Sequence, residues 1–153
     1  MHRARLTLLV GLGVALAATP GAARAQTVVG VQNLAFGTVI PGVPVTIAPT
    51  DAVRAGQYRI TGLFLATVTV TFTLPTAMNR VGGGASIPLT FLNTSGQWDP
   101  AVGATTTFNP NSPYTAFVWL GTTLVSLGGR ASPAPSQLGG SYTSNIIMTV
   151  IIN

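Results

Sequence analysis

Two carboxylates, Asp51 and Asp99, are the only acidic side chains in this chain. A pair of carboxylates is the minimum for general acid–base hydrolysis of a glycosidic bond, and with backbone carbonyls it can hold Ca²⁺. Both lie beside turn residues, in Pro49-Thr50-Asp51 and in Asp99-Pro100, where an aspartate commonly caps the local backbone. No Asp-x-Asp spacing occurs. We therefore expect both carboxylates to be structural, with no metal site.

Nucleophilic chemistry is equally poorly supported. From residue 26 onward the chain has several serines but no Lys, Glu, His or Cys. Without a His or Lys to accept its proton, a serine is not activated in the usual way. The run at 82–84 is all glycine but lacks the lysine of a phosphate-binding loop, and it favours a hairpin turn. We expect no catalytic residue, no cofactor and no enzymatic activity.

Aromatic side chains could instead form a ligand platform. Trp119 lies in the apolar run Phe117-Val118-Trp119-Leu120, so we expect it in the core. Trp98 lies in Gly96-Gln97-Trp98-Asp99-Pro100, a segment whose composition predicts a turn. Trp98 is therefore the one aromatic that the sequence predicts to be exposed and available to a ligand.

The first 25 residues resemble a secretory signal peptide. A basic start with Arg3 and Arg5 precedes an apolar run at 6–18, and Ala23-Arg24-Ala25 offers small residues for cleavage before Gln26. The apolar run is shorter than the roughly 20 residues of a membrane span, although an uncleaved anchor is the alternative. We expect export to the periplasm, the cell surface or the medium, and no stable membrane span after cleavage.

Charge gives little support for nucleic-acid binding. The formal net charge of +5 includes Arg3, Arg5 and Arg24. Residues 26–153 carry four scattered arginines against two aspartates, a net charge of +2. No Lys/Arg cluster is present to neutralise successive phosphates, so we expect no nucleic-acid partner.

The alternation of apolar and polar residues predicts β-strands in several segments of the chain. Thr67–Leu74 places Val and Phe on one face and Thr on the other, and Tyr142–Ile152 alternates in the same way. Weaker strands are expected at 28–36, 43–48, 57–63, 87–92, 114–120 and 122–127. Turn residues separate these short runs, a spacing typical of a single antiparallel sandwich or barrel. Residues 26–153 are expected to form one domain.

Three ordered motifs resemble a known family. Leu34-Ala35-Phe36-Gly37-Thr38 is similar to the opening of the DUF4402 domain and of the related spore coat protein U-like domain. The segment at 56–62 and the strand ending in Leu74-Pro75 are similar to the next two motifs of that group. Gly128-Gly129, a Pro-rich loop and Gly140-Ser141-Tyr142-Thr143 match its ending.

The resemblance implies an immunoglobulin-like antiparallel β-sandwich, either complete or lacking one strand. Members of this group are related to subunits of archaic chaperone–usher pili, in which a strand from a neighbour fills a groove. The edge strands are then the interaction residues. On the donor side these are Val28, Val29, Val31 and Leu34. On the groove side these are Tyr142, Ile146, Met148, Val150 and Ile152.

The function expected from these features is a non-catalytic structural subunit of a bacterial surface fibre or coat. Its expected partners are further copies or neighbouring pilin-like subunits, a periplasmic chaperone and an outer-membrane usher. The alternative is a monomeric extracellular or periplasmic binding module with Trp98 near its ligand. The two hypotheses differ in one testable property, which is whether the sandwich is stable without a strand from elsewhere.

Overall fold

The computed structural model describes residues 26–153, so the predicted signal peptide lies outside the described residues. The described part consists of strands, turns and loops and has no helix, so no helix there could cross a membrane. The strands are β1 (Thr27–Gln32), β2 (Val45–Ile47), β3 (Gly56–Thr73), β4 (Ala77–Arg80), β5 (Ser86–Thr90), β6 (Gly96–Pro100), β7 (Thr106–Phe108), β8 (Tyr114–Leu127), β9 (Gly129–Ala131), β10 (Tyr142–Thr143) and β11 (Ile147–Ile152).

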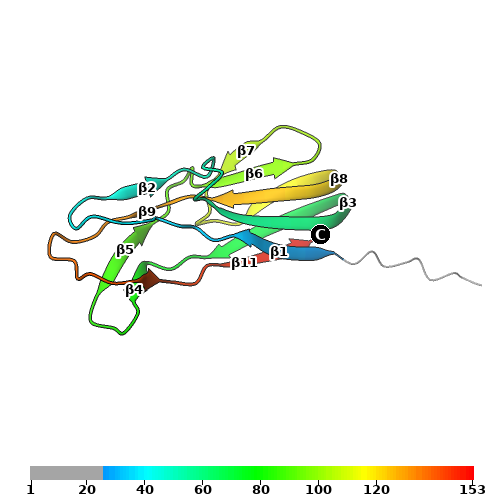
Figure 1. The fold of residues 1–153 in the computed structure, drawn as a ribbon. Helices are drawn as coiled ribbons and strands as arrows, with labels where there is room; N and C mark the ends of the chain where they lie inside the picture. Colours follow the sequence, from blue (N-terminus) through cyan, green and yellow to red (C-terminus); the bar gives the residue numbers. More distant parts are fainter. Residues whose placement is uncertain (1–25) are drawn as a thin grey trace, which may run out of the picture.

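A long antiparallel ribbon of β3 and β8 forms the centre of the fold. The two strands pair from Gly56↔Leu127 to Val70↔Tyr114, with an irregularity after Ile60. The ribbon folds over on itself, as a distance within β3 shows. The ring centroids of Tyr58 and Phe72 are only 5.7 Å apart, although both residues belong to this strand. In a straight strand the same two residues would be roughly 46 Å apart. Figure 1 shows both strands bending at the end of the molecule nearest the start of β1.

Glycines and one leucine make this fold-over possible. Gly62 (φ 82°) and Gly121 (φ 99°) occupy left-handed backbone conformations at the bend, where residues with a Cβ are strained. Leu65, at φ 45°, is the only residue other than glycine with a positive φ in the described chain. The bend therefore lies where the alternating pattern of β3 is interrupted, between its two apolar halves.

The folded ribbon gives the sandwich its two layers. Layer A contains the first half of β3 and the second half of β8, flanked by β1 on one side and by β6 and β7 on the other. Layer B contains the second half of β3, the first half of β8 and β11. All pairings are antiparallel. The predicted all-β antiparallel sandwich is confirmed.

A second sheet closes one side of this arrangement. Its order is β10-β4-β5-β9-β2. Because β4 follows β3 of layer B and β9 follows β8 of layer A, β5 links the two layers by hydrogen bonds at the far end of the molecule. Along the lower edge of the molecule in Figure 1, β1 and β11 are not paired with one another in the described chain.

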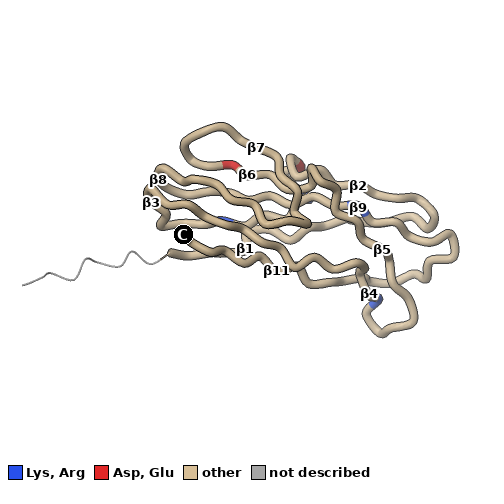
Figure 2. Tube along the Cα trace, turned by 180° about the vertical axis from the view of Figure 1, so that it is seen from behind, with Lys and Arg blue, Asp and Glu red and all other residues tan. Residues whose placement is uncertain are grey.

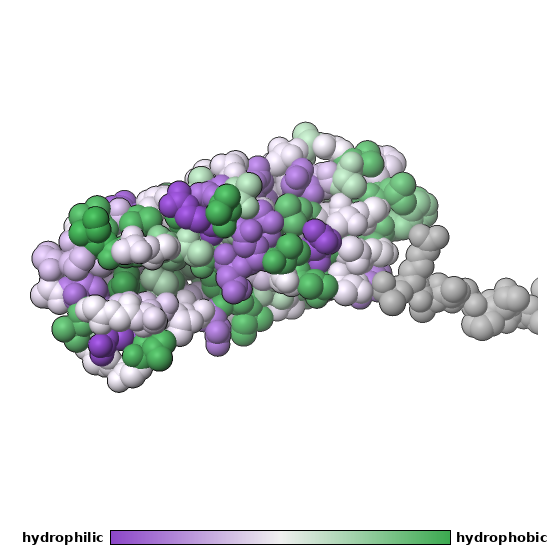
Figure 3. Space-filling view, in the orientation of Figure 1, coloured by the Kyte–Doolittle hydropathy of each residue, from purple (hydrophilic) through white to green (hydrophobic). Residues whose placement is uncertain are grey.

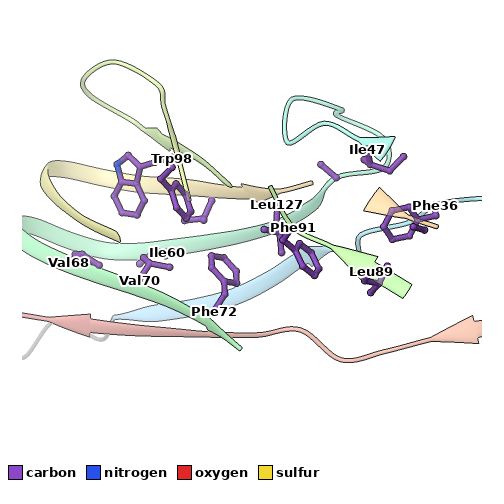
Figure 4. Close-up of a cluster of buried hydrophobic side chains, with 14 of the residues drawn as sticks. Phe36, Ile47, Ile60, Val68, Val70, Phe72, Leu89, Phe91, Trp98 and Leu127 are labelled. Atoms are coloured by element: carbon purple, nitrogen blue, oxygen red, sulfur yellow. The ribbon is translucent and has the colours of Figure 1, made fainter. Parts of the chain in front are cut away.

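Side chains from both layers meet in one continuous core. Ile60 and Trp98 from layer A face Val70 and Phe72 from layer B (Figure 4). Phe36, Ile47 and Leu89 extend the core toward the second sheet. The aromatic rings stack on one another, with Phe108 and Tyr114 4.4 Å apart. Burial of this apolar surface is the main source of stability for a chain without disulfides.

The structure corrects several strand predictions. Residues 57–63 and 67–73 belong to one strand, as do 114–120 and 122–127, because the ladder continues through the bend. The expected strand Tyr142–Ile152 is interrupted between β10 and β11. The short strands β4, β6, β7 and β9 were not predicted, since their few residues lack a clear alternation.

The clearest sequence pattern is confirmed. Val68, Val70 and Phe72 of β3 are buried. The threonines between them lie on the outer face of layer B, where the hydroxyls of Thr69 and Thr115 are 3.0 Å apart. On the neighbouring β11, the residues opposite these threonines are Ile147, Thr149 and Ile151.

Candidate functional site

The open side of the sandwich contains a groove, which we call the edge groove. One wall is the segment 33–41, which leaves β1 of layer A. The other wall is the segment 137–146, which leads through β10 into β11 of layer B. Phe36, Met78, Ile87 and Leu89 line it from the core side. The groove therefore lies beyond the end of β1 and before the start of β11, against β4 and β5 of the second sheet.

The edge groove is large and uncharged. It comprises two adjoining cavities of ≈ 680 and ≈ 410 Å³, which share Leu34, Phe36, Met78 and Tyr142. None of its lining residues is charged. One end is narrowed by a hydrogen bond from the Gly42 amide to the carbonyl of Ala134 (3.1 Å). Its lining combines apolar side chains with hydroxyl, amide and backbone groups, which suits an extended peptide or a small uncharged ligand.

Local hydrogen bonds hold the wall at 137–146 in place. The Tyr142 hydroxyl donates to the carbonyl of Leu138 and accepts a bond from Gln137 Nε2, each 2.6 Å long. Arg80 Nε donates to the carbonyl of Gly139 (2.9 Å). This wall is thus tied to β4 and to its own turn. The segment 33–41 is held by a hydrogen bond from the Ala35 amide to the carbonyl of Arg54 (2.9 Å).

Tyr58 closes the groove toward β1. It lines the smaller cavity and packs edge-on against Phe72. Burial raises the pKa of its phenol above the usual 10.0, because an apolar environment disfavours the phenolate. The neutral ring therefore adds to the uncharged lining of the groove.

The structure places the expected donor residues on an exposed edge strand. β1 pairs with the first half of β3, from Thr27↔Thr61 to Gln32↔Gln57, and the register shifts between Gly30 and Gln32. Val28, Val29 and Val31 are between 44% and 50% exposed, so neither face of β1 is buried. Leu34 differs from the expectation of a donor residue, because it is half-buried and forms part of the groove wall.

The expected groove-side residues fall into three groups in the structure. Tyr142 and Ile146 line the edge groove. Met148 and Val150 of β11 pack against the core of their own sandwich. Ile152, at the end of β11, is exposed. The alternation of this strand thus separates an inward face from the outward Ile147 and Ile151, as the period of two requires.

Both tryptophan predictions are wrong, and in opposite directions. Trp98 belongs to β6, pairs with Val125 and is only 3% exposed. It packs beside Tyr114 in the core, so it cannot contact a ligand at the surface. Trp119 was expected in the core and is 60% exposed beside Phe117, at the bend of β8. Because β8 bends, its outward positions meet solvent even within an apolar run.

The two carboxylates lie apart and have separate local roles. Asp51 accepts hydrogen bonds from the amides of Val53 and Arg54, and it forms a salt bridge of 2.9 Å with Arg54. These contacts lower its pKa below the usual 3.8, with the Val53 amide as the largest cause. Asp99 Oδ1 accepts a bond from Thr105 Oγ1 (2.7 Å). Figure 2 shows that the few charged residues of the described chain are scattered.

Metal ligands do not gather in the described part of the chain. Residues 26–153 contain no cluster of three or more His, Cys, Asp or Glu side chains. No family model matches the chain, and no curated protein matches it in sequence. The edge groove and the strands beside it are therefore the features on which a functional hypothesis can be based.

Proposed function

We propose that this chain is an exported, non-catalytic structural subunit of a bacterial surface fibre or coat, assembled by β-strand complementation. The edge groove carries the proposal, since it is uncharged and lies between the segment that follows β1 and the segment that precedes β11. An added strand gains backbone hydrogen bonds along a free sheet edge and buries alternate side chains. This is the mode of assembly that the resemblance to archaic pilin subunits implies.

β1 is the segment that we propose as the donor. In this structure it lies on its own β3, so exchange requires that it leave that edge and bind to another copy. Its side chains lose little on leaving, because Val28, Val29 and Val31 are about half exposed where they are. Buried against the apolar side chains of the groove, the same valines would each gain roughly 1–2 kcal/mol.

The edge strands also lack the usual protection against pairing. Natural edge strands are commonly blocked by Lys, Pro or an inward-pointing charge. Neither β1 nor β11 contains a charged residue or a proline. Such edges favour pairing with another chain, and a chaperone that covers them during export is consistent with this property.

A matched pair of substitutions tests the proposal. Val150 faces inward on β11 and its neighbour Ile151 faces outward. We expect Val150→Asp to abolish secretion or assembly, because a charge would be buried without a partner. Ile151→Asp should leave both intact. Normal surface assembly of the Val150→Asp variant would contradict the proposal.

Size-exclusion chromatography with light scattering, on the protein recovered from the periplasm, tests directly whether the sandwich lacks a strand. A fibre subunit should form filaments or aggregates that a peptide of residues 26–34 dissolves into stable complexes. Substituting Val29 and Val31 by Ser should weaken this self-association without affecting the groove. A soluble monomer that melts cooperatively and ignores the peptide would instead indicate a complete sandwich.

One observation favours the alternative function of a monomeric binding module. β1 is already paired with β3 of its own chain, so the described residues form a sandwich without a second copy. In that case the edge groove would hold a small apolar ligand near Tyr58 and Tyr142, and Trp98 would have no part in binding. A ligand-dependent rise in melting temperature, with an unchanged monomer mass, would support this alternative.

A further inference from the structure

The outer face of layer B carries a group of side chains that the proposed function does not use. Hydrophobic residues reach the surface along the whole length of the molecule in Figure 3, so exposure alone does not single out a site. This group differs because aromatic and hydrogen-bonding side chains lie next to one another on one face of the sheet. We call it the outer platform, and it consists of Thr67, Thr69, Thr115, Phe117, Trp119 and Asn153.

Strand pairing places four of these side chains at neighbouring positions. The residues of β3 on either side of Thr69 are buried, so Thr67 and Thr69 point outward. Thr67 pairs with Phe117, and Thr69 pairs with Thr115, across the antiparallel ladder. The side chains of paired residues lie on the same face of a sheet, with their Cβ atoms about 5 Å apart. The four side chains therefore form one contiguous surface.

Hydrogen bonds join the polar half of the outer platform from β8 to the end of β11. The Thr69 hydroxyl lies 3.0 Å from the Thr115 hydroxyl and accepts a hydrogen bond of 3.0 Å from Asn153 Nδ2. Asn153 follows β11 directly, and its backbone amide donates to the carbonyl of Thr67 (2.9 Å). A hydroxyl can donate once and accept twice, and an asparagine side chain can donate twice and accept twice. These bonds therefore fix the polar groups in place and use only part of their capacity.

Aromatic rings form the other half of the outer platform. The rings of Phe117 and Trp119 meet edge to face, with their centroids 5.2 Å apart. Trp119 is 60% exposed, and Phe117 is 47% exposed. The face of an exposed tryptophan ring is flat, apolar and weakly negative, so the C–H groups of a ligand can stack on it. The platform thus combines a stacking surface with a row of hydrogen-bonding groups.

No basic side chain accompanies these groups. The strand segments 67–73, 114–119 and 147–153, which form this face, contain no Lys, Arg or His and no Asp or Glu. An acidic polymer or a nucleic acid would find no cation there to pair with its charges. The ligand that suits the outer platform is therefore uncharged.

The size of this face argues against another protein as its occupant. Three strands of about seven residues cover roughly 14 by 24 Å, or about 340 Å². A standard protein interface buries about 800 Å² on each partner, so a second copy would need further contacts elsewhere. Neither cavity of the edge groove includes a residue of the outer platform. The platform is an open surface, which admits an extended chain that continues beyond both of its ends.

We propose that the outer platform binds a neutral polysaccharide with an extended, ribbon-like chain, such as the chains of cellulose and chitin. A sugar ring has an apolar face of C–H groups, which stacks on Trp119. It also has a rim of hydroxyl groups, which exchange hydrogen bonds with Thr115 and Asn153. Such a ligand matches both halves of the platform and carries no charge. This binding function is separate from the edge groove and adds attachment to a polymer to the proposed structural role.

Titration with soluble fragments of these polymers tests the proposal. The protein, expressed as the full chain and recovered from the periplasm, is titrated with cellohexaose and, separately, with N-acetylchitohexaose. We expect a saturable change in Trp fluorescence with at least one of them, and retention of the protein on the matching insoluble polymer, cellulose or chitin. Trp119 reports the binding, because Trp98, the other tryptophan, is buried in the core.

Paired variants identify the surface responsible, with affinities measured by calorimetry because variants of Trp119 lack the fluorescent reporter. Trp119→Ala should weaken binding about tenfold or more, since it removes the stacking ring, and Trp119→Tyr should restore part of the affinity. Thr115→Val keeps the shape of the side chain but removes its hydroxyl, and it should weaken binding several-fold. Leu120→Ala is the matched control, because Leu120 is 53% exposed on the opposite face of β8 and should leave binding unchanged. All four variants should retain the melting temperature of the original protein.

Three results would overturn the proposal. The first is that the original protein shows no fluorescence change with either saccharide and is retained on neither polymer. The second is that Trp119→Ala binds as tightly as the original, or that Leu120→Ala weakens binding as much as Trp119→Ala does. The third is a dimer that Trp119→Ala dissociates, without binding of either saccharide, which would assign the platform to a second copy. None of these results depends on the edge groove, so each leaves the proposed strand complementation untouched.

Discussion

At the scale of single residues, one polar group in the core is unusual. Thr123 of β8 is fully buried, and its hydroxyl has no hydrogen-bond partner within the described residues. A buried hydroxyl without a partner carries a desolvation cost that an apolar group of the same shape avoids. Thr123 lies opposite Ile60, at the point where the ladder of β3 and β8 becomes irregular.

Thr123→Val should therefore stabilise the protein. We expect the free energy of unfolding to rise by about 1 kcal/mol, measured by urea denaturation. Thr122→Val changes the neighbouring exposed residue and serves as the control, with little expected effect. An equal or lower stability for Thr123→Val would show that the hydroxyl is satisfied in solution.

Asp51 gives the protein a specific sensitivity to acid. Because its pKa in the folded state is lowered below 3.8, ionised Asp51 stabilises the folded state above that value. This stabilisation is lost as the pH falls through the folded pKa. Asp51→Asn should be less stable at neutral pH and should lose less stability on acidification, which melting curves recorded from about pH 5 downward would show. Parallel pH dependences of the two proteins would contradict this.

At the scale of the elements, Gly128 joins β8 to β9 where two segments approach very closely. A Cβ at this position would lie 2.3 Å from the carbonyl oxygen of Ile47 and 2.8 Å from the nitrogen of Pro49. Both are backbone atoms, so relief requires the chain at 47–49 to move. The absence of a side chain thus allows β8, which ends in layer A, to continue into the second sheet.

Gly128→Ala should destabilise the protein by about 3 kcal/mol, at the upper end of the cost of overpacking. Chemical denaturation measures the change. Gly139→Ala is the matched control, because a Cβ at Gly139 meets no atom within 4 Å and its φ is not positive. Similar stabilities for the two variants would mean that the backbone at 47–49 moves away from residue 128 at little cost in free energy.

At the scale of the whole molecule, the two layers are joined at one end and unpaired along one edge. β5 joins the layers at the far end, where Ile87 and Leu89 also line the edge groove, whereas β1 and β11 are edge strands that do not pair with one another in the described chain. β1 has both faces half exposed, so little apolar burial opposes its release. The fold therefore combines a stable ribbon with a weakly held first strand.

Hydrogen exchange should reveal this difference. We expect the amides of β1 to exchange about tenfold or more faster than those of the central β8, with β11 intermediate because Met148 and Val150 pack against the core. Mass spectrometry of peptides from the three strands measures this order. Protection of β1 equal to that of β8 would show that β1 is an integral part of the core and does not exchange between copies.

Much of the local structure could be predicted from the sequence. The alternation at 67–74 identified the buried face of the second half of β3, and Ile146, Met148 and Val150 were placed on the inward face of the last strand. Such assignments depend only on the period of two along a strand. The edge groove could not be predicted, because its two walls, 33–41 and 137–146, are about a hundred residues apart in the chain and meet only through the sheets.

The sequence by itself determined that this protein is an all-β chain poor in charge, with alternating strands, because backbone geometry ties side-chain direction to position along each strand. The tertiary structure alone decided that β3 and β8 fold over into both layers. That bend buries Trp98, exposes Trp119 and leaves the side between β1 and β11 open. The physical reason is that burial depends on which distant segments pack together, and a local pattern carries no information about that choice.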